Sequence, residues 1–156
     1  MRPRGFTLIE LVITVAILAV LATMALPMLQ VSVQRQKESE LRAALRDIRG
    51  ALDAYRQAVA DKKVEAAADA SGYPPDLEAL VKGVPDISRP DRRPIHFLRR
   101  LPRDPMQADA SLAAAETWGT RSYASPPDEP QAGADVFDVY SLSDKRALDG
   151  SRYRDW

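Results

Sequence analysis

The chain has 156 residues, no cysteine, one histidine, and equal numbers of basic and acidic residues, 22 of each. This length allows one membrane segment and one small domain, and the lack of cysteine excludes a disulfide framework. The balanced charge gives no reason to expect nucleic acid as a partner.

The N-terminal segment begins with Arg2 and Arg4 and then becomes apolar, with no charged residue from Leu11 to Gln34. At a rise of about 1.5 Å per residue, a helix of this length spans the roughly 30 Å hydrocarbon core of a bilayer. Residues 6–34 are therefore predicted to form a transmembrane helix, with the arginines on the cytoplasmic side and the remaining chain across the membrane. A removed secretory signal fits poorly, because its apolar region is usually only about 7 to 15 residues long.

Glu10 and Pro27 interrupt the apolar pattern of this segment. A carboxylate that enters a bilayer costs about 3 kcal/mol even on the mildest scale, so Glu10 either has a charged partner or lies shallow enough to reach headgroups and water. Pro27 has no amide hydrogen and clashes with the preceding turn. This predicts a kink or a short melted stretch at residues 23–27.

The motif GFTLIE at residues 5–10 resembles the class III signal of type IV pilins and type II secretion pseudopilins. The resemblance implies that residues 1–5 are a leader, that a prepilin peptidase cuts between Gly5 and Phe6, and that the new Phe6 amine is methylated. It also implies that Glu10 acts in subunit assembly. The cationic amine of a neighbouring subunit would then lie beside the Glu10 carboxylate within an apolar helix bundle.

Residues 35–65 are predicted to continue the helix in amphipathic form. Apolar residues recur at spacings of three and four, which places them on one helix face. They are Leu41, Leu45, Ile48, Leu52, Tyr55 and Val59. This apolar stripe should pack on the protein's own C-terminal domain, while Glu38 with Arg42 and Arg49 with Asp53 are spaced to form ion pairs along the helix.

Residues 66–156 are predicted to form a C-terminal α/β globular domain. After a linker at 66–71, Asp76 can cap a short helix at 77–82 that Gly83 ends. The segment 84–110 contains five prolines, which exclude a central strand or a long helix. Its six arginines should pair with acids on this or an adjacent subunit, or else form a docking surface for another secretion component. His96 alone supports neither a metal site nor a catalytic relay.

The best strand candidates are residues 121–124 and 136–142. An antiparallel pair or a three-stranded sheet packed against the apolar stripe would cover the aromatic residues of this region, with Trp156 at the edge of the core. The expected fold class is therefore α+β and, by the resemblance, pilin-like: a long N-terminal helix, transmembrane in its first half, packed on a small C-terminal antiparallel sheet.

The segment 136–144, with Asp149-Gly150 after it, is similar to the C-terminal region of type II secretion major pseudopilins. In that family a loop after this strand holds a calcium ion, so the resemblance implies a calcium site here with Asp144 and Asp149 as candidate ligands. The loop in this chain is shorter and poorer in glycine. It also carries four cations that offer direct ion pairing as the alternative to a metal: Lys145, Arg146, Arg152 and Arg154.

The resemblance implies a structural role without a required cofactor: a subunit of a periplasmic pseudopilus that drives type II protein secretion. Implied partners are identical subunits, minor pseudopilins, the inner-membrane platform and the prepilin peptidase, with a single pass through the bacterial inner membrane and a periplasmic C-terminal domain. An enzyme is not expected, since the sequence shows no nucleophile and base constellation. The alternatives are a minor pilin of a type IV pilus or DNA-uptake system, and a membrane-anchored periplasmic binding module that never assembles.

Overall fold

The computed structural model describes residues 6–67 and 70–156, with only the backbone described at 22–27. The chain divides into two compact units, Met1–Gln36 and Lys37–Trp156. Gly5, and with it one side of the expected cleavage point, lies outside the described residues. The second unit begins within the long helix, because the helix from Lys37 onward packs with the C-terminal region.

Helix α1 extends from Leu8 to Ala60, 53 residues in all. In the first unit, every large apolar side chain described between residues 6 and 33 is exposed, from 39% for Val31 to 81% for Leu8. Within the described residues, no helix combines the length and hydropathy that a membrane crossing requires. The transmembrane assignment of residues 6–34 stays a prediction.

The backbone at residues 23–27 is helical. The short melted stretch that Pro27 was expected to produce is therefore not seen in the single subunit, and the kink stays a prediction.

Helix α1 also ends earlier than the predicted segment 35–65. Lys62 adopts a left-handed φ of 59°, and its amide and that of Lys63 donate to the carbonyls of Val59 and Ala58. This is the Schellman ending, here made without the glycine that usually marks it.

The predicted apolar stripe is confirmed as the core-facing side of α1. Leu41, Leu45, Ile48, Leu52 and Tyr55 are buried, and Val59 packs against the same cluster while remaining partly exposed. The cluster also takes in residues from the far end of the chain, among them Trp118, Val136, Val139 and Tyr153. The hydrophobic core of the second unit is thus built on one face of one helix.

Strands β3 (Trp118–Arg121) and β4 (Asp138–Ser141) form the antiparallel pair, with Trp118 opposite Ser141 and Arg121 opposite Asp138. Strand β4 lies inside the predicted range 136–142, but the predicted strand at 121–124 is wrong. Strand β3 begins three residues earlier and ends at Arg121. The chain leaves the ladder there because the Asp135 carboxylate accepts hydrogen bonds from the Ser122 hydroxyl and the Tyr123 amide, at 2.6 and 2.9 Å.

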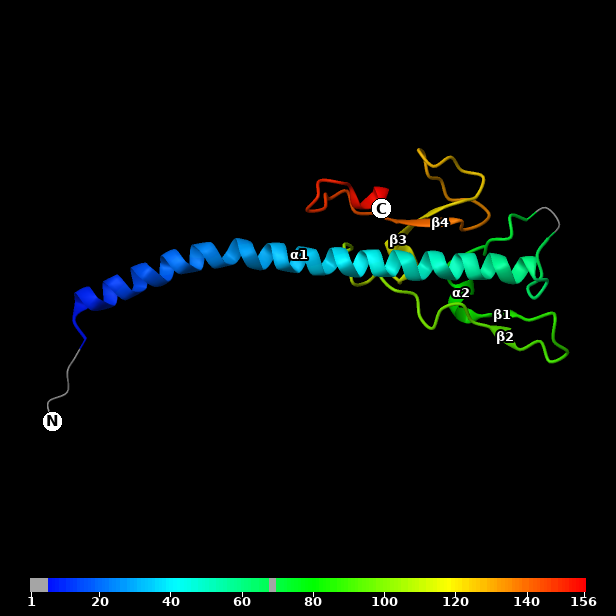
Figure 1. Ribbon diagram of the computed structural model, residues 1–156, viewed down its shortest axis with the longest axis horizontal. Helices are drawn as coiled ribbons and strands as arrows, with labels where there is room; N and C mark the ends of the chain where they lie inside the picture. The colour runs from blue at the N-terminus through cyan, green and yellow to red at the C-terminus, as the bar shows by residue number, and fades with distance from the viewer. Residues whose placement is uncertain (1–5, 68–69) are drawn as a thin grey trace. The chain divides into compact units, whose positions relative to one another are not determined.

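Helix α2 (Ala79–Lys82) is the predicted short helix, and the Asp76 carboxylate accepts a hydrogen bond from the Ala79 amide at 2.8 Å. Beside it, β1 (Val84–Pro85) and β2 (Pro94–Ile95) pair antiparallel over two residues each (Figure 1). This small hairpin was not predicted. It is compatible with the prolines, because so short a peripheral ladder needs few amide donors.

The arginine-rich segment 84–110 is anchored to β3 and β4 by polar contacts. Asp104 is 2% exposed, and its carboxylate accepts a hydrogen bond from the Ser141 hydroxyl at 2.5 Å. The Trp118 indole donates to the Pro102 carbonyl at 2.9 Å. Short 3₁₀ turns flank the sheet at η1 (Ala115–Thr117) and η2 (Tyr153–Asp155). The segment is therefore an ordered loop, as predicted.

Two glycines give a matched test of this packing. A Cβ at Gly119 would lie 2.3 Å from the ring of Tyr140, its partner across the ladder. A Cβ at Gly50, in the middle of α1, would meet nothing within 4 Å. We expect Gly119→Ala to lower the free energy of unfolding by about 1–3 kcal/mol and Gly50→Ala to raise it by about 0.5–1 kcal/mol. Urea denaturation followed by tryptophan fluorescence measures both, and equal effects of the two changes would contradict the packing described.

Candidate functional site

The N-terminal end of α1 carries the residues that the sequence assigned to processing and assembly. Phe6 is 80% exposed and precedes the first helical residue. The Thr7 hydroxyl accepts a hydrogen bond from the Glu10 amide at 3.3 Å, which is the N-cap contact of a Thr-x-x-Glu pattern. We had not predicted this cap, although its spacing is visible in the sequence. It places Glu10 in the first turn, where a negative charge is favoured by the helix dipole.

The Glu10 carboxylate makes no hydrogen bond or ion pair with any described residue, and Glu10 is exposed. Its neighbours on the same helix are exposed apolar side chains, among them Leu8, Ile9 and Ile13. The side chain of Pro27 lies outside the described residues. Between residues 8 and 21, Glu10 is thus the one charged side chain among exposed and mainly apolar neighbours.

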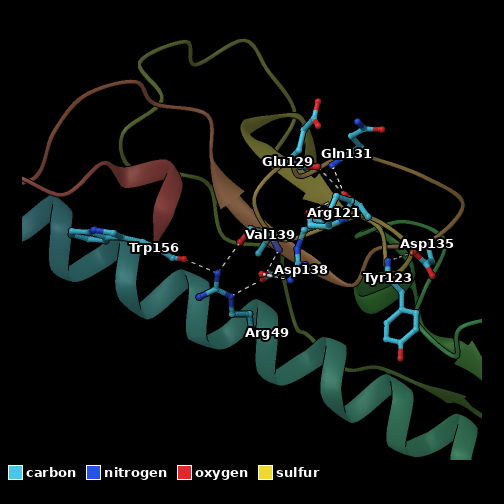
Figure 2. Close-up of polar contacts among 11 residues, drawn as sticks. Arg49, Arg121, Tyr123, Glu129, Gln131, Asp135, Asp138, Val139 and Trp156 are labelled. Carbon is cyan, nitrogen blue, oxygen red and sulfur yellow. Dashed lines mark hydrogen bonds and ion pairs between the residues drawn. The ribbon is translucent and has the colours of Figure 1, made fainter.

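In the second unit, Arg49 joins α1 to β4 and to the end of the chain (Figure 2). Its Nε donates to Asp138 at 2.8 Å, and its Nη2 donates to the main-chain oxygens of Val139 and Trp156 at 3.1 and 2.6 Å. Arg121 approaches the other Asp138 oxygen at 3.4 Å. The pairing of Arg49 with Asp53 predicted from spacing is therefore replaced by a contact across the fold.

Glu38 holds the C-terminal loop, residues 142–152, against α1. It is 5% exposed, and its carboxylate accepts hydrogen bonds from the Tyr153 hydroxyl at 2.9 Å and the Leu148 amide at 2.8 Å. Tyr153 is itself 1% exposed. Sequence reasoning paired Glu38 with Arg42 along the helix and did not single out Tyr153. In the sequence, Tyr153 stands out as an aromatic residue near the end of the chain, but this does not identify Glu38 as its partner.

The two candidate calcium ligands, Asp144 and Asp149, have different surroundings. Asp144 is exposed, and its side chain makes no hydrogen bond or ion pair with the described residues. Asp149 accepts hydrogen bonds from the hydroxyl and amide of Ser151, at 2.6 and 2.9 Å, and lies 3.7 Å from Arg42. These hydrogen bonds, with a smaller effect of Arg42, hold the pKa of Asp149 below its ordinary value.

The arginines of segment 84–110 are partly paired, as expected. Arg89 and Arg93 pair with Asp86 and Asp91, at 3.3 and 2.8 Å, and Arg103 donates to main-chain oxygens of the following loop. The His96 ring nitrogen Nδ1 lies 3.0 Å from the Val81 carbonyl, so its contact is with the backbone.

Comparison with known proteins gives a consistent result. Residues 1–26 match the model of the prokaryotic N-terminal methylation motif. Type II secretion system core protein G of Klebsiella pneumoniae is 30% identical over 143 residues, which cover 86% of this chain and 93% of that protein. The chain belongs to the core protein G family. The Dickeya chrysanthemi member is 31% identical over 122 residues, covering 76% of this chain and 72% of that protein. No solved structure gives a significant match.

The calcium site implied by the resemblance to major pseudopilins stays a prediction, and the described C-terminal loop bears on it through the oxygen atoms that it offers. Calcium takes about six to eight oxygen ligands. Across residues 6–67 and 70–156, no three acidic or histidine side chains are grouped to hold a metal ion. The Asp149 carboxylate is occupied by Ser151, and the Gly150 carbonyl accepts a hydrogen bond from Arg146 at 2.8 Å.

The Arg49 contacts lead to a stability prediction. We expect Arg49→Ala to lower the free energy of unfolding by about 1.5–3 kcal/mol, because hydrogen bonds to charged groups are lost. Arg49→Lys should restore only part of this, since a lysine cannot reproduce the planar arrangement of donors. The control is Arg46→Ala, an exposed arginine whose side chain makes no hydrogen bond or ion pair with the described residues, which should change stability by less than about 0.5 kcal/mol. Equal losses for Arg46→Ala and Arg49→Ala would show that the contacts are not formed.

Proposed function

We propose that this chain is a structural subunit of a periplasmic pseudopilus that drives type II protein secretion, assembled after prepilin peptidase cleavage and N-methylation. The observation that carries the proposal is the coincidence of the methylation motif at residues 1–26 with 30% identity over 93% of a core protein G. The motif alone would also fit a minor pilin. The match through the C-terminal region favours the secretion pseudopilus.

The surface of the first unit supports insertion and assembly. A helix that is apolar on all sides is normally buried in lipid or in a bundle of helices. The exposed apolar side chains between residues 6 and 33 are then covered by the inner membrane before assembly and by neighbouring subunits in the filament. We propose a single pass with a cytoplasmic N-terminus and a periplasmic C-terminal domain, consistent with the positive charges of Arg2 and Arg4.

Glu10 supplies the register for adding subunits. Cleavage between Gly5 and Phe6 creates a cationic amine, and a neighbouring subunit shifted by about one helical turn can place that amine beside the Glu10 carboxylate. In apolar surroundings either charge alone is strongly disfavoured, so the pair selects one axial position among many apolar contacts. The Thr7 cap supports this role because it fixes the helix start without engaging the carboxylate.

The action we propose is mechanical and involves no catalysis by this chain. Energy comes from a separate cytoplasmic ATPase, since the sequence has no phosphate-binding glycine loop. The proposed partners are identical subunits, minor pseudopilins, the inner-membrane platform and the prepilin peptidase. The backbone contact of His96, the only histidine, is consistent with a structural role.

Processing is tested by the intact mass and N-terminal sequence of the membrane-extracted protein, expressed with and without a prepilin peptidase. We expect a chain that begins at methylated Phe6 only when the peptidase is present. An unaltered Met1 terminus in the presence of a peptidase that cleaves a known prepilin would overturn the proposal, leaving a signal-anchored module.

Assembly is tested with Glu10→Gln. Glutamine keeps the Thr-x-x-Glu/Gln capping pattern, so the variant removes the charge and leaves the helix start intact. We expect membrane insertion and cleavage at Phe6 to be retained and filament formation, measured by shearing and electron microscopy, to fall at least about tenfold, as the loss of 1.4 kcal/mol or more per contact requires. Glu10→Asp, which keeps the charge, is the control and should retain part of the assembly. Wild-type filament yield from Glu10→Gln would exclude the register role.

A further inference from the structure

The contacts of the C-terminal loop have the opposite polarity from those of a calcium loop. A calcium loop turns carboxylates and carbonyl oxygens toward a shared centre. In this chain the loop turns the Leu148 amide toward the carboxylate of Glu38, which is 5% exposed. The loop is thus held on α1 by a negative side chain that accepts a hydrogen bond, whereas a calcium loop is held by a positive ion.

Oxygen atoms of Asp149 and Gly150, which lie in this loop, face cations of the protein. Arg146 Nη1 donates to the Gly150 carbonyl at 2.8 Å, across the turn that it closes. Arg42 lies 3.7 Å from the Asp149 carboxylate, and its guanidinium lies 4.0 Å from the centre of the Trp156 ring. An arginine supplies positive charge and fixed donors at once, so it satisfies the oxygens that a metal would otherwise bind.

We propose that side chains of this protein replace the calcium ion: Glu38 and Arg42 hold the C-terminal loop on α1 and Arg146 closes its turn, all without a metal, and these three residues are here called the clasp. The inference concerns the isolated subunit and does not depend on the proposed function. The proposal rests on the hydrogen-bond donors and acceptors that face one another in and around the loop. Substitutions of the same three residues test it.

The three residues of the clasp should contribute unequally to the stability of the loop. Glu38 is buried and accepts hydrogen bonds from both Leu148 and Tyr153, so its loss leaves the buried Tyr153 hydroxyl without its acceptor. Arg42 and Asp149 have side chains 49% and 57% exposed, and such surface pairs contribute little in water. Glu38 should therefore dominate, with Arg42 contributing mainly through its packing over Trp156.

The first measurement is the thermal unfolding of the full-length, detergent-extracted wild-type protein, followed by tryptophan fluorescence, with EGTA or with about 10 mM calcium, about a hundred times a Kd of 10⁻⁴ M. We expect the two melting temperatures to agree within about 1 °C, whereas a site filled to a hundred times its Kd would raise the melting temperature by about 5 °C or more. A saturable rise with calcium, absent with magnesium, would overturn the proposal without any variant having to fold.

The second measurement uses variants in EGTA. We expect Glu38→Gln to lower the melting temperature by about 3–6 °C and Arg146→Ala by less, each with faster protease cleavage within residues 142–152. The controls are Asp47→Asn on the same helix and Lys145→Ala in the same loop, both exposed and with side chains that make no hydrogen bond or ion pair with the described residues. They should leave the melting temperature and the cleavage rate unchanged. Glu38→Gln behaving like Asp47→Asn would show that the clasp does not hold the loop.

Discussion

One face of α1 carries most of what holds the second unit together. The regular structure that packs on it is small: β3 and β4 have four residues each, and β1 and β2 have two. A two-stranded ladder of this size is not stable alone in water. Its stability must come from burial against the apolar stripe of α1, where Leu41, Ile48 and Leu52 are almost completely removed from solvent.

Apolar contacts on this face of α1 stabilise the second unit, but they do not specify a unique register for the segments that pack on it. A row of polar side chains beside the apolar stripe specifies that register. Glu38, Arg42 and Arg49 are four and seven residues apart, so they lie along one side of the helix. Each reaches a segment distant in the sequence: Glu38 the C-terminal loop, Arg42 the Trp156 ring, and Arg49 both β4 and Trp156. The stripe attracts the C-terminal region, and the polar row positions it.

This division explains what the sequence could predict. The stripe, strand β4 and the Asp76 cap follow from local periodicity and spacing, and all three are observed. The partners of Glu38 and Arg49 are about a hundred residues away, so local spacing could only offer their nearest charged neighbours. The first strand was misplaced because Gly119 weakens its local signal, while Tyr140 across the ladder covers the glycine. Long-range polar contacts and cross-strand packing are invisible to a local pattern.

The two units differ in whether their polar and apolar groups find partners within the same unit. In the described part of the second unit no buried side-chain nitrogen or oxygen lacks a hydrogen-bond partner, whereas the first unit exposes apolar side chains along its described length. Apolar surface of this kind favours association with lipid or other helices but does not choose among axial positions. A single carboxylate does, because moving it away from its countercharge in apolar surroundings is costly. In the assembly that we propose, the Glu10 carboxylate, which makes no hydrogen bond or ion pair with the described residues, contributes the specificity that the apolar surface lacks.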